Sequence, residues 1–356
     1  MTRNKENFVA DLFGDFPEGN MPMYDIGNRR YMGSKTKLVG WIHSVIYNVA
    51  HDARTFFDVF AGTGAVGNKA LDYYEKVVFN DFLYSNFVTL NAFLADGNYD
   101  KERVKDFIDE MNNVDGSLLP ENYFSINFGG KYFGMEAARK IGYIREEIEA
   151  RMPEFSMKEY YVLVASLIYS ADRIANTIGQ YEAYRKNVTE FKDFEMGMVE
   201  AKCHDCVRIY NKDANVLARE VKCDIAYLDP PYNSRQYCSL YHVPENLAKW
   251  DKPEVHYDTA KPLDMENKSE YCRKNALKVF TDLVLTLDAR YIAVSYNNTY
   301  NAKSDTSNNK MTLEDIRQTL EMRGITMVFE KDYKPFDAGK TELDNHKEYL
   351  FLTKVK

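Results

Sequence analysis

The amino-acid sequence predicts an α/β fold in which helices cover both faces of a mainly parallel sheet and a helical subdomain is inserted into the chain. Three observations predict it. The apolar run at residues 223–228 is short and ends in Asp229-Pro230-Pro231-Tyr232, which is typical of a buried strand of a parallel sheet. A second strand pattern, at residues 56–60, runs into a glycine-rich turn and a helix. Between about residues 96 and 200 the alternation of strands and helices stops, which indicates an insertion.

The composition is that of a globular chain. Of 356 residues, 45% are hydrophobic and 28% are charged, which allows one large or two modest domains. No segment approaches the ~18 uncharged apolar residues of a membrane span, and the N-terminus lacks the apolar core of a signal peptide. The five cysteines are scattered and odd in number, so we expect a cytoplasmic protein. The C-x-x-C at residues 203–206 lacks a second ligand pair, and we therefore expect no metal site.

The charge of the chain limits how it could bind nucleic acid. The formal net charge is −8 at pH 7, which disfavours a protein that binds nucleic acid with its whole surface. A nucleic-acid site would therefore need a local basic cluster. One candidate cluster lies at residues 29–37. A second lies at residues 131–151, where interspersed glutamates make a solvated helix face the alternative.

Near the N-terminus, residues 1 to about 26 contain two glycines and two prolines, and we expect an irregular extension that lies on the domain. The motif Arg30-Tyr31-Met32-Gly33-Ser34-Lys35 follows. It precedes an amphipathic helical pattern with apolar residues at positions 38, 42, 45 and 46. A Gly-Ser turn that opens a helix is common, so this motif has little weight alone.

The run at residues 56–67 is the second strong signal. Gly62, Gly64 and Gly67 satisfy G-x-G-x-x-G, and Asp81 follows at about the distance of an acid that binds a ribose hydroxyl. This fingerprint alone would suggest a nicotinamide or flavin enzyme. Asp58 argues against that, because an acid just before the glycines would repel a pyrophosphate at the helix N-terminus. The acid suits S-adenosylmethionine, which carries an ammonium and a sulfonium and no phosphate. Asp81 could alternatively cap the helix that follows it.

The inserted segment is mainly helical, with helical patterns at residues 103–111, 136–151 and 157–178. Between the first two, residues 122–133 interleave aromatic side chains with Asn, Gly and Lys. This stretch either contacts nucleic acid or forms a hairpin that packs on its own helices, and the sequence gives the two interpretations nearly equal support.

The α/β pattern returns at residues 207–210, and Asp213 follows this strand. After the strand at residues 223–228 the chain is polar, and Arg235 could hold a phosphate or contact a base edge. Three further strand patterns complete the sheet, and the last two are typical of a closing hairpin. They lie at residues 291–298, 327–329 and 348–352.

Asp229-Pro230-Pro231-Tyr232 resembles the catalytic motif of S-adenosylmethionine-dependent amino-methyltransferases. An exocyclic amine is a poor nucleophile, because its lone pair is delocalised into the ring. The Asp229 carboxylate and the Pro230 carbonyl can each accept one N–H of that amine. These two hydrogen bonds draw the nitrogen towards tetrahedral geometry and direct its lone pair at the methyl group. Tyr232 can stack on the base.

The order of the motifs is Y-x-G-S-K, the glycine loop, the insert and D-P-P-Y. This order resembles the alpha group of DNA adenine-N6 methyltransferases, the Dam-like and DpnII-type enzymes, from Arg30 to about Leu352. The resemblance implies a Rossmann-like methyltransferase sheet in residues 1–95 and 201–356 and a helical target-recognition subdomain in residues 96–200. It implies double-stranded DNA as the substrate, with the target adenine flipped out of the duplex.

The resemblance also assigns roles to individual residues. It implies catalytic roles for Asp229, Pro230, Pro231 and Tyr232. It implies S-adenosylmethionine contacts for Tyr31, Gly33, Lys35, Asp58, Phe60, Gly62, Gly64, Asp81, Asp213 and Asp229. It implies DNA contacts for Lys131, Tyr132 and Arg235.

Some features of the activity stay open in the sequence. Cytosine-N4 methylation is the nearest alternative, but those enzymes usually have Ser at the position of Asp229. Methylation of RNA is another, and a catalytically silent DNA-binding module is a third, which the intact Asp58 and Asp229 disfavour. The resemblance implies a monomer of bacterial or phage origin, used in restriction-modification or epigenetic marking, and allows a cognate restriction endonuclease as partner. The sequence does not say which bases flank the target adenine.

Overall fold

The computed structural model describes residues 21–29, 31–177, 179–299, 308–332 and 346–356. The expected N-terminal extension therefore lies largely outside the described residues. The chain divides into two compact units. Unit 1 combines three segments, within Met1–Met32, Val88–Cys203 and His242–Leu263. Unit 2 combines the segments within Gly33–Phe87, His204–Tyr241 and Asp264–Lys356.

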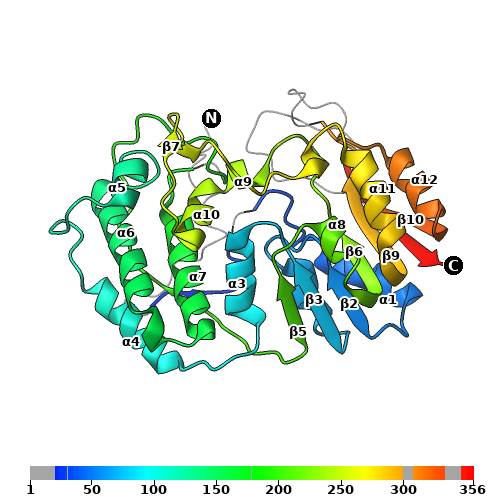
Figure 1. The fold of residues 1–356 in the computed structure, drawn as a ribbon, viewed down its shortest axis with the longest axis horizontal. Helices are drawn as coiled ribbons and strands as arrows, with labels where there is room; N and C mark the ends of the chain where they lie inside the picture. The colour runs from blue at the N-terminus through cyan, green and yellow to red at the C-terminus, as the bar shows by residue number, and fades with distance from the viewer. Residues whose placement is uncertain (1–20, 30, 178, 300–307, 333–345) are drawn as a thin grey trace, which may run out of the picture. The chain divides into compact units, whose positions relative to one another are not determined.

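Unit 2 contains the predicted sheet, and seven of the described strands form it in the order β10-β11-β9-β6-β2-β3-β5 (Figure 1). The five strands from β9 to β5 are parallel to their neighbours, whereas β11 runs antiparallel to both β9 and β10. This confirms the mainly parallel α/β sheet and its closing hairpin. The strands are β2 (Thr55–Asp58), β3 (Lys76–Asn80), β5 (Val207–Tyr210), β6 (Lys222–Leu228), β9 (Asp288–Asn297), β10 (Gly324–Asp332) and β11 (Lys347–Val355).

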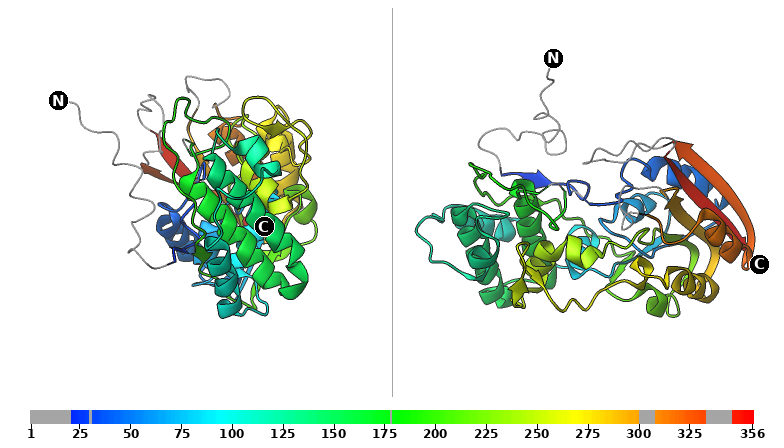
Figure 2. Two further views of the ribbon diagram at one scale, coloured as in Figure 1. Left: turned by 90° about the vertical axis from the view of Figure 1, so that its left-hand side faces the viewer. Right: turned by 90° about the horizontal axis from the view of Figure 1, so that it is seen from above.

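Helices cover both faces of this sheet, and Figure 2 shows α1 on the side opposite to α11 and α12. One face packs Phe57, Ile292 and Phe351 into a buried cluster with residues of α8, α11 and α12. On the other face, Phe56 stacks on Tyr227 of the neighbouring strand and lies 5.6 Å from the His43 ring of α1. The helices of unit 2 are α1 (Val39–Val49), α2 (Ala65–Ala70), α8 (Ala214–Leu217), α9 (Tyr237–Leu240), α11 (Ala276–Thr286) and α12 (Leu313–Glu321), with a 3₁₀ turn η4 (Glu270–Cys272).

The strand order of unit 2 reverses beside β2. The chain passes from β2 outward to β3 and β5, and then returns to β6 on the opposite side of β2. Loops that leave the carboxyl ends of β2 and β6 therefore diverge, which opens space for a ligand at this edge. Both sequence motifs with chemical content, the glycine loop and D-P-P-Y, follow these two strands.

Unit 1 is mainly helical. Its central helix, α7, begins after Ser156, whose hydroxyl accepts the Glu159 N–H while the Glu159 carboxylate accepts the Ser156 N–H, and thirteen of its residues are buried. It packs against α4, α6 and α10. The helices are α4 (Lys101–Asn112), α5 (Tyr123–Phe128), α6 (Met135–Ala150), η3 (Met152–Glu154), α7 (Met157–Ile174) and α10 (His242–Lys249). Two short strand pairs join them, β1 (Met23–Tyr24) with β4 (Met198–Val199) and β7 (Val255–His256) with β8 (Lys261–Pro262).

Unit 1 contains residues 96–200, which the sequence predicts as an insert, and two further segments that the resemblance assigned to the catalytic domain. One is the chain up to Met32, where β1 pairs with β4, and the other is residues 242–263, which contain α10. On the N-terminal side of the insert, the boundary between the two units falls within α3 (Tyr84–Leu94). No helix in the described parts of the chain has the length and apolar character needed to cross a membrane.

Candidate active site

Two acidic side chains stand at the carboxyl edge of the unit 2 sheet, where the strand order reverses. Asp58 is the last residue of β2, and Asp229 directly follows β6. The two strands pair in parallel with Asp58 opposite Tyr227, and the Val59 N–H donates to the Tyr227 carbonyl over 3.0 Å. The two acids are therefore held on neighbouring strands by backbone hydrogen bonds.

The glycine loop requires its glycines for two different reasons. Gly62 and Gly64 have φ of 55° and 84°, a left-handed conformation that residues with a Cβ adopt only at a cost. Gly67 instead allows α2 to approach β3, because a Cβ on Gly67 would stand 2.2 Å from Cε1 of Phe79. The loop therefore leaves the edge of the sheet with no side chain at positions 62 and 64, where a bound cofactor could approach the backbone.

Asp58 is buried without full satisfaction of its carboxylate. The residue is only 1% exposed, and its Oδ2 accepts the Gly67 N–H over 2.9 Å. Oδ1 has no hydrogen-bond partner among the described residues. Burial, with smaller contributions from the charges of Asp229 and Asp81, raises the pKa of Asp58 to about 8, although the Gly67 N–H opposes this rise. A cation or a strong donor placed at Oδ1 would restore the ionised form.

Asp81 serves the loop itself. Its Oδ2 accepts the Gly62 N–H over 2.8 Å, and its Oδ1 accepts the Leu83 N–H over 2.8 Å and the Asn86 side-chain amide over 3.0 Å. The alternative that Asp81 stabilises the start of the following helix is therefore realised. Because each carboxylate oxygen carries two lone pairs, an acid that fixes a loop can also accept a ribose hydroxyl, and the two roles are compatible.

Lys35 and the D-P-P-Y motif form a compact polar cluster. The Lys35 ammonium donates to Asp229 Oδ1 over 3.0 Å and to the Tyr232 hydroxyl over 2.5 Å, and Lys35 is only 5% exposed. The Tyr232 hydroxyl also donates to Asp229 Oδ1. Lys35 and Tyr232 both donate to Oδ1 of Asp229, and no side chain of the described residues donates to Oδ2. Oδ2 is therefore the oxygen that can accept a hydrogen bond from a substrate.

The backbone and the ring of Tyr232 are fixed by their neighbours. The Tyr232 carbonyl accepts the Lys310 N–H over 2.7 Å, and its ring packs edge-on against Tyr296 with centroids 4.7 Å apart. The preceding Pro230 is buried, while Pro231 is half-buried. This rigidity fits a motif whose carbonyl and carboxylate must keep a set separation.

Other predicted site residues in unit 2 lie near this edge with different degrees of engagement. Phe60 packs edge-on against Tyr271, with centroids 5.1 Å apart. Asp213 is exposed and caps α8 by accepting the Asn215 and Val216 N–H groups. Gly33 has φ of 77°, and its carbonyl accepts a hydrogen bond from the Lys35 ammonium over 3.3 Å. Arg235 is half-buried in the segment that follows D-P-P-Y.

The remaining predicted residues, Tyr31, Lys131 and Tyr132, belong to unit 1. Tyr31 and Lys131 are half-buried. Tyr132 requires a correction, because it is fully buried and cannot offer its ring to DNA. Its hydroxyl donates to the carbonyls of Tyr181 over 2.6 Å and Thr259 over 3.0 Å, so this side chain fills the core of unit 1.

The aromatic stretch at residues 122–133 therefore follows the packing interpretation in part. Its first half is the short helix α5, capped by reciprocal hydrogen bonds between Asn122 and Ser125, and not a hairpin strand. Phe124, Phe128 and Phe133 are fully buried. The extended pairing that the structure describes in this stretch is a single bridge between residues 129 and 133. The exposed residues of this stretch are Ile126, at 64%, and Gly130, while Lys131 is half-buried.

Sequence reasoning missed one acid at the site. Glu348 of β11 is 5% exposed and lies opposite Asn297, the last residue of β9. Burial raises its pKa to about 7, and the charges that act on it most strongly are those of Lys35 and Asp229. The signal that could have found it is an acid at an inward-facing position of a strand otherwise filled by Leu350 and Leu352.

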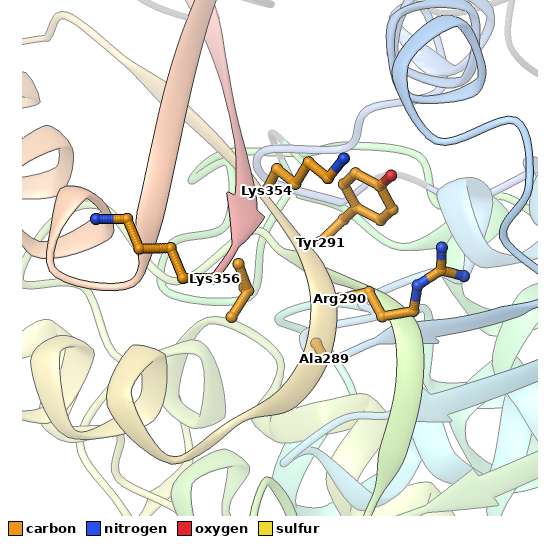
Figure 3. A pocket seen from close by; sticks show the side chains of 6 residues that line it. Ala289, Arg290, Tyr291, Lys354 and Lys356 are labelled. Carbon is orange, nitrogen blue, oxygen red and sulfur yellow. The ribbon is translucent and has the colours of Figure 1, made fainter.

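A pocket in unit 2 lies elsewhere. Figure 3 shows it at the start of β9 and the end of β11, lined by Ala289, Arg290, Tyr291, Lys354, Val355 and Lys356. Arg290 is paired there with Asp52 and with Asp224. The acids described above follow the opposite ends of the parallel strands, so this pocket is separate from the candidate site. Among the described residues, no three His, Cys, Asp or Glu side chains gather to hold a metal ion.

Comparison with known proteins defines the class to which this site belongs. Residues 31–318 match the model of the D12 class of N6 adenine-specific DNA methyltransferases. The chain is 32% identical to the type II methyltransferase M.NlaIII of Neisseria lactamica, over 90% of this chain and 98% of the relative. It is 30% identical to the type II methyltransferase M.CviAII of Paramecium bursaria Chlorella virus 1, over 92% of this chain and 98% of the relative. It is 31% identical to the type II methyltransferase M.FokI of Planomicrobium okeanokoites, over 90% of this chain and about half (52%) of the relative.

The fold, the D-P-P-Y site and these similarities define a DNA methyltransferase. The chain belongs to the D12 class of N6 adenine-specific DNA methyltransferases, enzymes that methylate adenine at specific sites in DNA. This confirms the adenine-N6 interpretation over the cytosine-N4, RNA and non-enzyme alternatives.

Proposed function

We propose that S-adenosylmethionine is the methyl donor and that it binds at the carboxyl ends of β2 and β3. The observation that carries this proposal is Oδ1 of Asp58, a buried carboxylate oxygen with no partner among the described residues. The ammonium of S-adenosylmethionine is a donor of the right charge for it, and the lack of side chains at Gly62 and Gly64 would let the cofactor approach the backbone of the loop. When bound, this group supplies an electrophilic methyl on a sulfonium.

The other residues assigned to the cofactor complete this proposal. Asp81 would accept a hydroxyl of the cofactor ribose beside the loop that it fixes. Asp213 would contact the adenine ring of the cofactor from its exposed position before α8. Phe60 would pack against the bound molecule, since its ring is half-buried beside Tyr271. Gly33, Lys35 and Tyr31 belong to the N-terminal motif and would each contact the cofactor.

We propose that Asp229 and Pro230 activate the amine of the target adenine. Oδ2 of Asp229 would accept one N–H, and the Pro230 carbonyl would accept the other. Both acceptors are held by a rigid segment, and the Lys35 and Tyr232 side chains fix Oδ1 so that Oδ2 has one orientation. The Tyr232 ring would stack on the base once it is flipped from the duplex.

A labelled-methyl experiment tests this proposal. Purified protein and radiolabelled S-adenosylmethionine are incubated with genomic DNA that lacks adenine methylation, and the DNA is digested and analysed as nucleosides. We expect label in N6-methyladenine for the wild type. Asp229→Asn should lose this label while it still binds S-adenosylmethionine by calorimetry, because it removes the acceptor charge and keeps the size. Asp288→Asn, at an exposed acid on β9, is the matched control and should match the wild type. Full activity of Asp229→Asn would refute the assignment.

We further propose that Lys131 and Arg235 contact the DNA, and that one chain carries out the reaction. The relatives named as type II methyltransferases suggest a cognate restriction endonuclease for this protein as well. Long-read sequencing of DNA from cells that express the protein would identify the methylated sequence. Protection of that sequence from a nuclease of the same specificity would support the pairing, and sedimentation of the DNA complex would test the single-chain stoichiometry.

A further inference from the structure

Glu348 is a buried acid at the edge of the sheet that the proposed mechanism leaves unused. It stands on β11 in register with Asn297 of β9, whose side chain hydrogen-bonds it. Its Oε2 has no hydrogen-bond partner in the described chain. In the described residues, two buried carboxylate oxygens lack a hydrogen-bond partner. They are Oε2 of Glu348 and Oδ1 of Asp58. Glu348 lies outside residues 31–318, so the family match does not include it.

The charges around Glu348 belong to the reaction site. Lys35 attracts it and Asp229 repels it, and its own charge acts on the hydroxyls of Tyr232 and Tyr227. In the other neighbouring strand, β10, Lys331 lies opposite Glu348 in register. Lys331 is exposed, and its ammonium lies 5.8 Å from the ring centroid of Trp41. The strand β9 also pairs with β6, which leads to Asp229, so Glu348 stands two strands from the reacting acid at the same edge of the sheet. Lys35 pairs with Asp229 over 3.0 Å and makes no ion pair with Glu348 among the described residues, but its buried positive charge acts on both acids.

A second buried acid near this ion pair matters for the chemistry. During methyl transfer, the electron pair of the adenine amine forms the new N–C bond, and the C–S bond breaks with its pair on sulfur. The positive charge moves from sulfur to nitrogen and stays there until that nitrogen releases a proton to solvent water. An isolated Lys35–Asp229 pair is neutral and stabilises this charge weakly. A second carboxylate gives the cluster a net charge of −1, which stabilises a positive nitrogen.

We propose that Glu348 is a positioning residue for methyl transfer, whose buried negative charge adds to the Lys35–Asp229 pair and keeps the amine site net negative. This inference rests on the proposed role of Asp229. It is distinct from a purely structural role, in which Glu348 would hold β9 and β11 together through Asn297. Gln at position 348 can still accept the Asn297 hydrogen bond, so Glu348→Gln removes the charge and keeps that contact.

The test measures the single-turnover rate of methylation from about pH 5.5 to 9, with saturating S-adenosylmethionine and DNA so that cofactor binding does not enter. For the wild type we expect the rate to fall as the pH drops below about 7, where Glu348 becomes protonated. Glu348→Gln should be slower by roughly tenfold at pH 8, as the loss of one nearby charge implies, and should lose this pH dependence. Glu348→Asp should recover part of the rate and the acidic limb. Glu330→Gln, at an exposed acid on β10, should behave as the wild type.

Several outcomes overturn the inference. A Glu348→Gln enzyme with the wild-type rate and pH profile would do so, and so would a wild-type rate that is flat from pH 6 to 8. The pH profile of the wild type needs no variant. It therefore still tests the inference if Glu348→Gln is misfolded and fails to bind S-adenosylmethionine. Failure of the proposed function is a different result, since the wild type would then form no N6-methyladenine at any pH.

Discussion

Asp58 is the residue whose replacement tests the cofactor site most directly. In Asp58→Asn, the side-chain oxygen can still accept the Gly67 N–H, and the amide NH₂ takes the position of the unpaired Oδ1. This NH₂ is a donor and faces the place where the ammonium of S-adenosylmethionine would lie. We therefore expect the variant to fold and to bind S-adenosylmethionine more weakly.

The size of the effect depends on pH. A hydrogen bond to a charged group contributes roughly 1.5–3 kcal/mol, which corresponds to about a 10- to 150-fold change in Kd. The pKa of Asp58 is about 8 in the free protein, so near pH 7 most of the protein must release a proton from Asp58 before the ion pair can form. Each pH unit below 8 therefore weakens wild-type binding by about tenfold, since one pKa unit is about 1.4 kcal/mol. The ammonium of the cofactor keeps its charge in this range, because α-amino groups titrate near 7.7–8.0.

Calorimetry can measure both consequences. Titrations at about pH 6 and pH 7 should show the wild-type Kd improving roughly tenfold, with no such change for Asp58→Asn. Titrations at pH 7 in two buffers of different ionisation enthalpy should show the release of nearly one proton by the wild type and none by the variant. Asp288→Asn serves as the control for a lost surface charge. Equal affinities with no proton release in the wild type would refute the assignment of Asp58 to the ammonium.

Three further predictions test the loop, the base platform and the DNA surface. Gly67→Ala should lower the melting temperature, since the added Cβ meets Phe79 and overpacking costs about 1–3 kcal/mol; an unchanged calorimetric Tm would contradict the close approach of α2 and β3. Tyr232→Phe should keep substantial methylation and Tyr232→Ala should lose most of it, because stacking is worth roughly 1–3 kcal/mol per base; equal fluorescence of an adenine analogue at the target position, together with equal rates, would show that the ring only packs. Lys131→Ala should weaken binding to specific and unrelated duplexes alike and reduce the salt slope by about one, and an unchanged slope would remove Lys131 from the interface.

Local signals were sufficient to predict the centre of unit 2. The strand at β6 and the strand–glycine–helix run at β2 each combine an apolar stretch with residues that terminate it, and both formed where the sequence placed them. The two acids at their ends needed only the rule that carboxyl ends of parallel strands share one edge. Asp81 was harder, because one carboxylate can cap a helix or bind a ribose, and the hydrogen bond to Gly62 depends on how two loops meet.

The insert shows what the sequence could not specify. Tyr132 lies among Asn, Gly and Lys residues in the chain, which is also the composition of a surface that binds nucleic acid. Its burial depends on Tyr181 and Thr259, which are distant in sequence and contribute the carbonyls that accept its hydroxyl. The segments at residues 21–32 and 242–263 join unit 1 through similar long-range contacts. No periodicity within either segment predicts such a partner.

Glu348 was missed for a related reason, and its position indicates how the site is built. An acid on an apolar strand is usually an edge residue in water, and β11 lies at the end of the chain, far in sequence from every motif. Antiparallel pairing with β9 brings it beside Asn297, and β9 in turn lies beside β6, which leads to Asp229. A buried carboxylate without a full set of donors is costly to the folded state. Two such groups, Asp58 and Glu348, occur at the same edge of one sheet. Their presence is explained if each stabilises a positive charge. Asp58 would stabilise the ammonium of the cofactor, and Glu348, with Asp229, would stabilise the positive charge that forms on the adenine nitrogen. The donor and the acceptor of the methyl group would then each lie beside a buried carboxylate whose unsatisfied oxygen is stabilised by a positive charge.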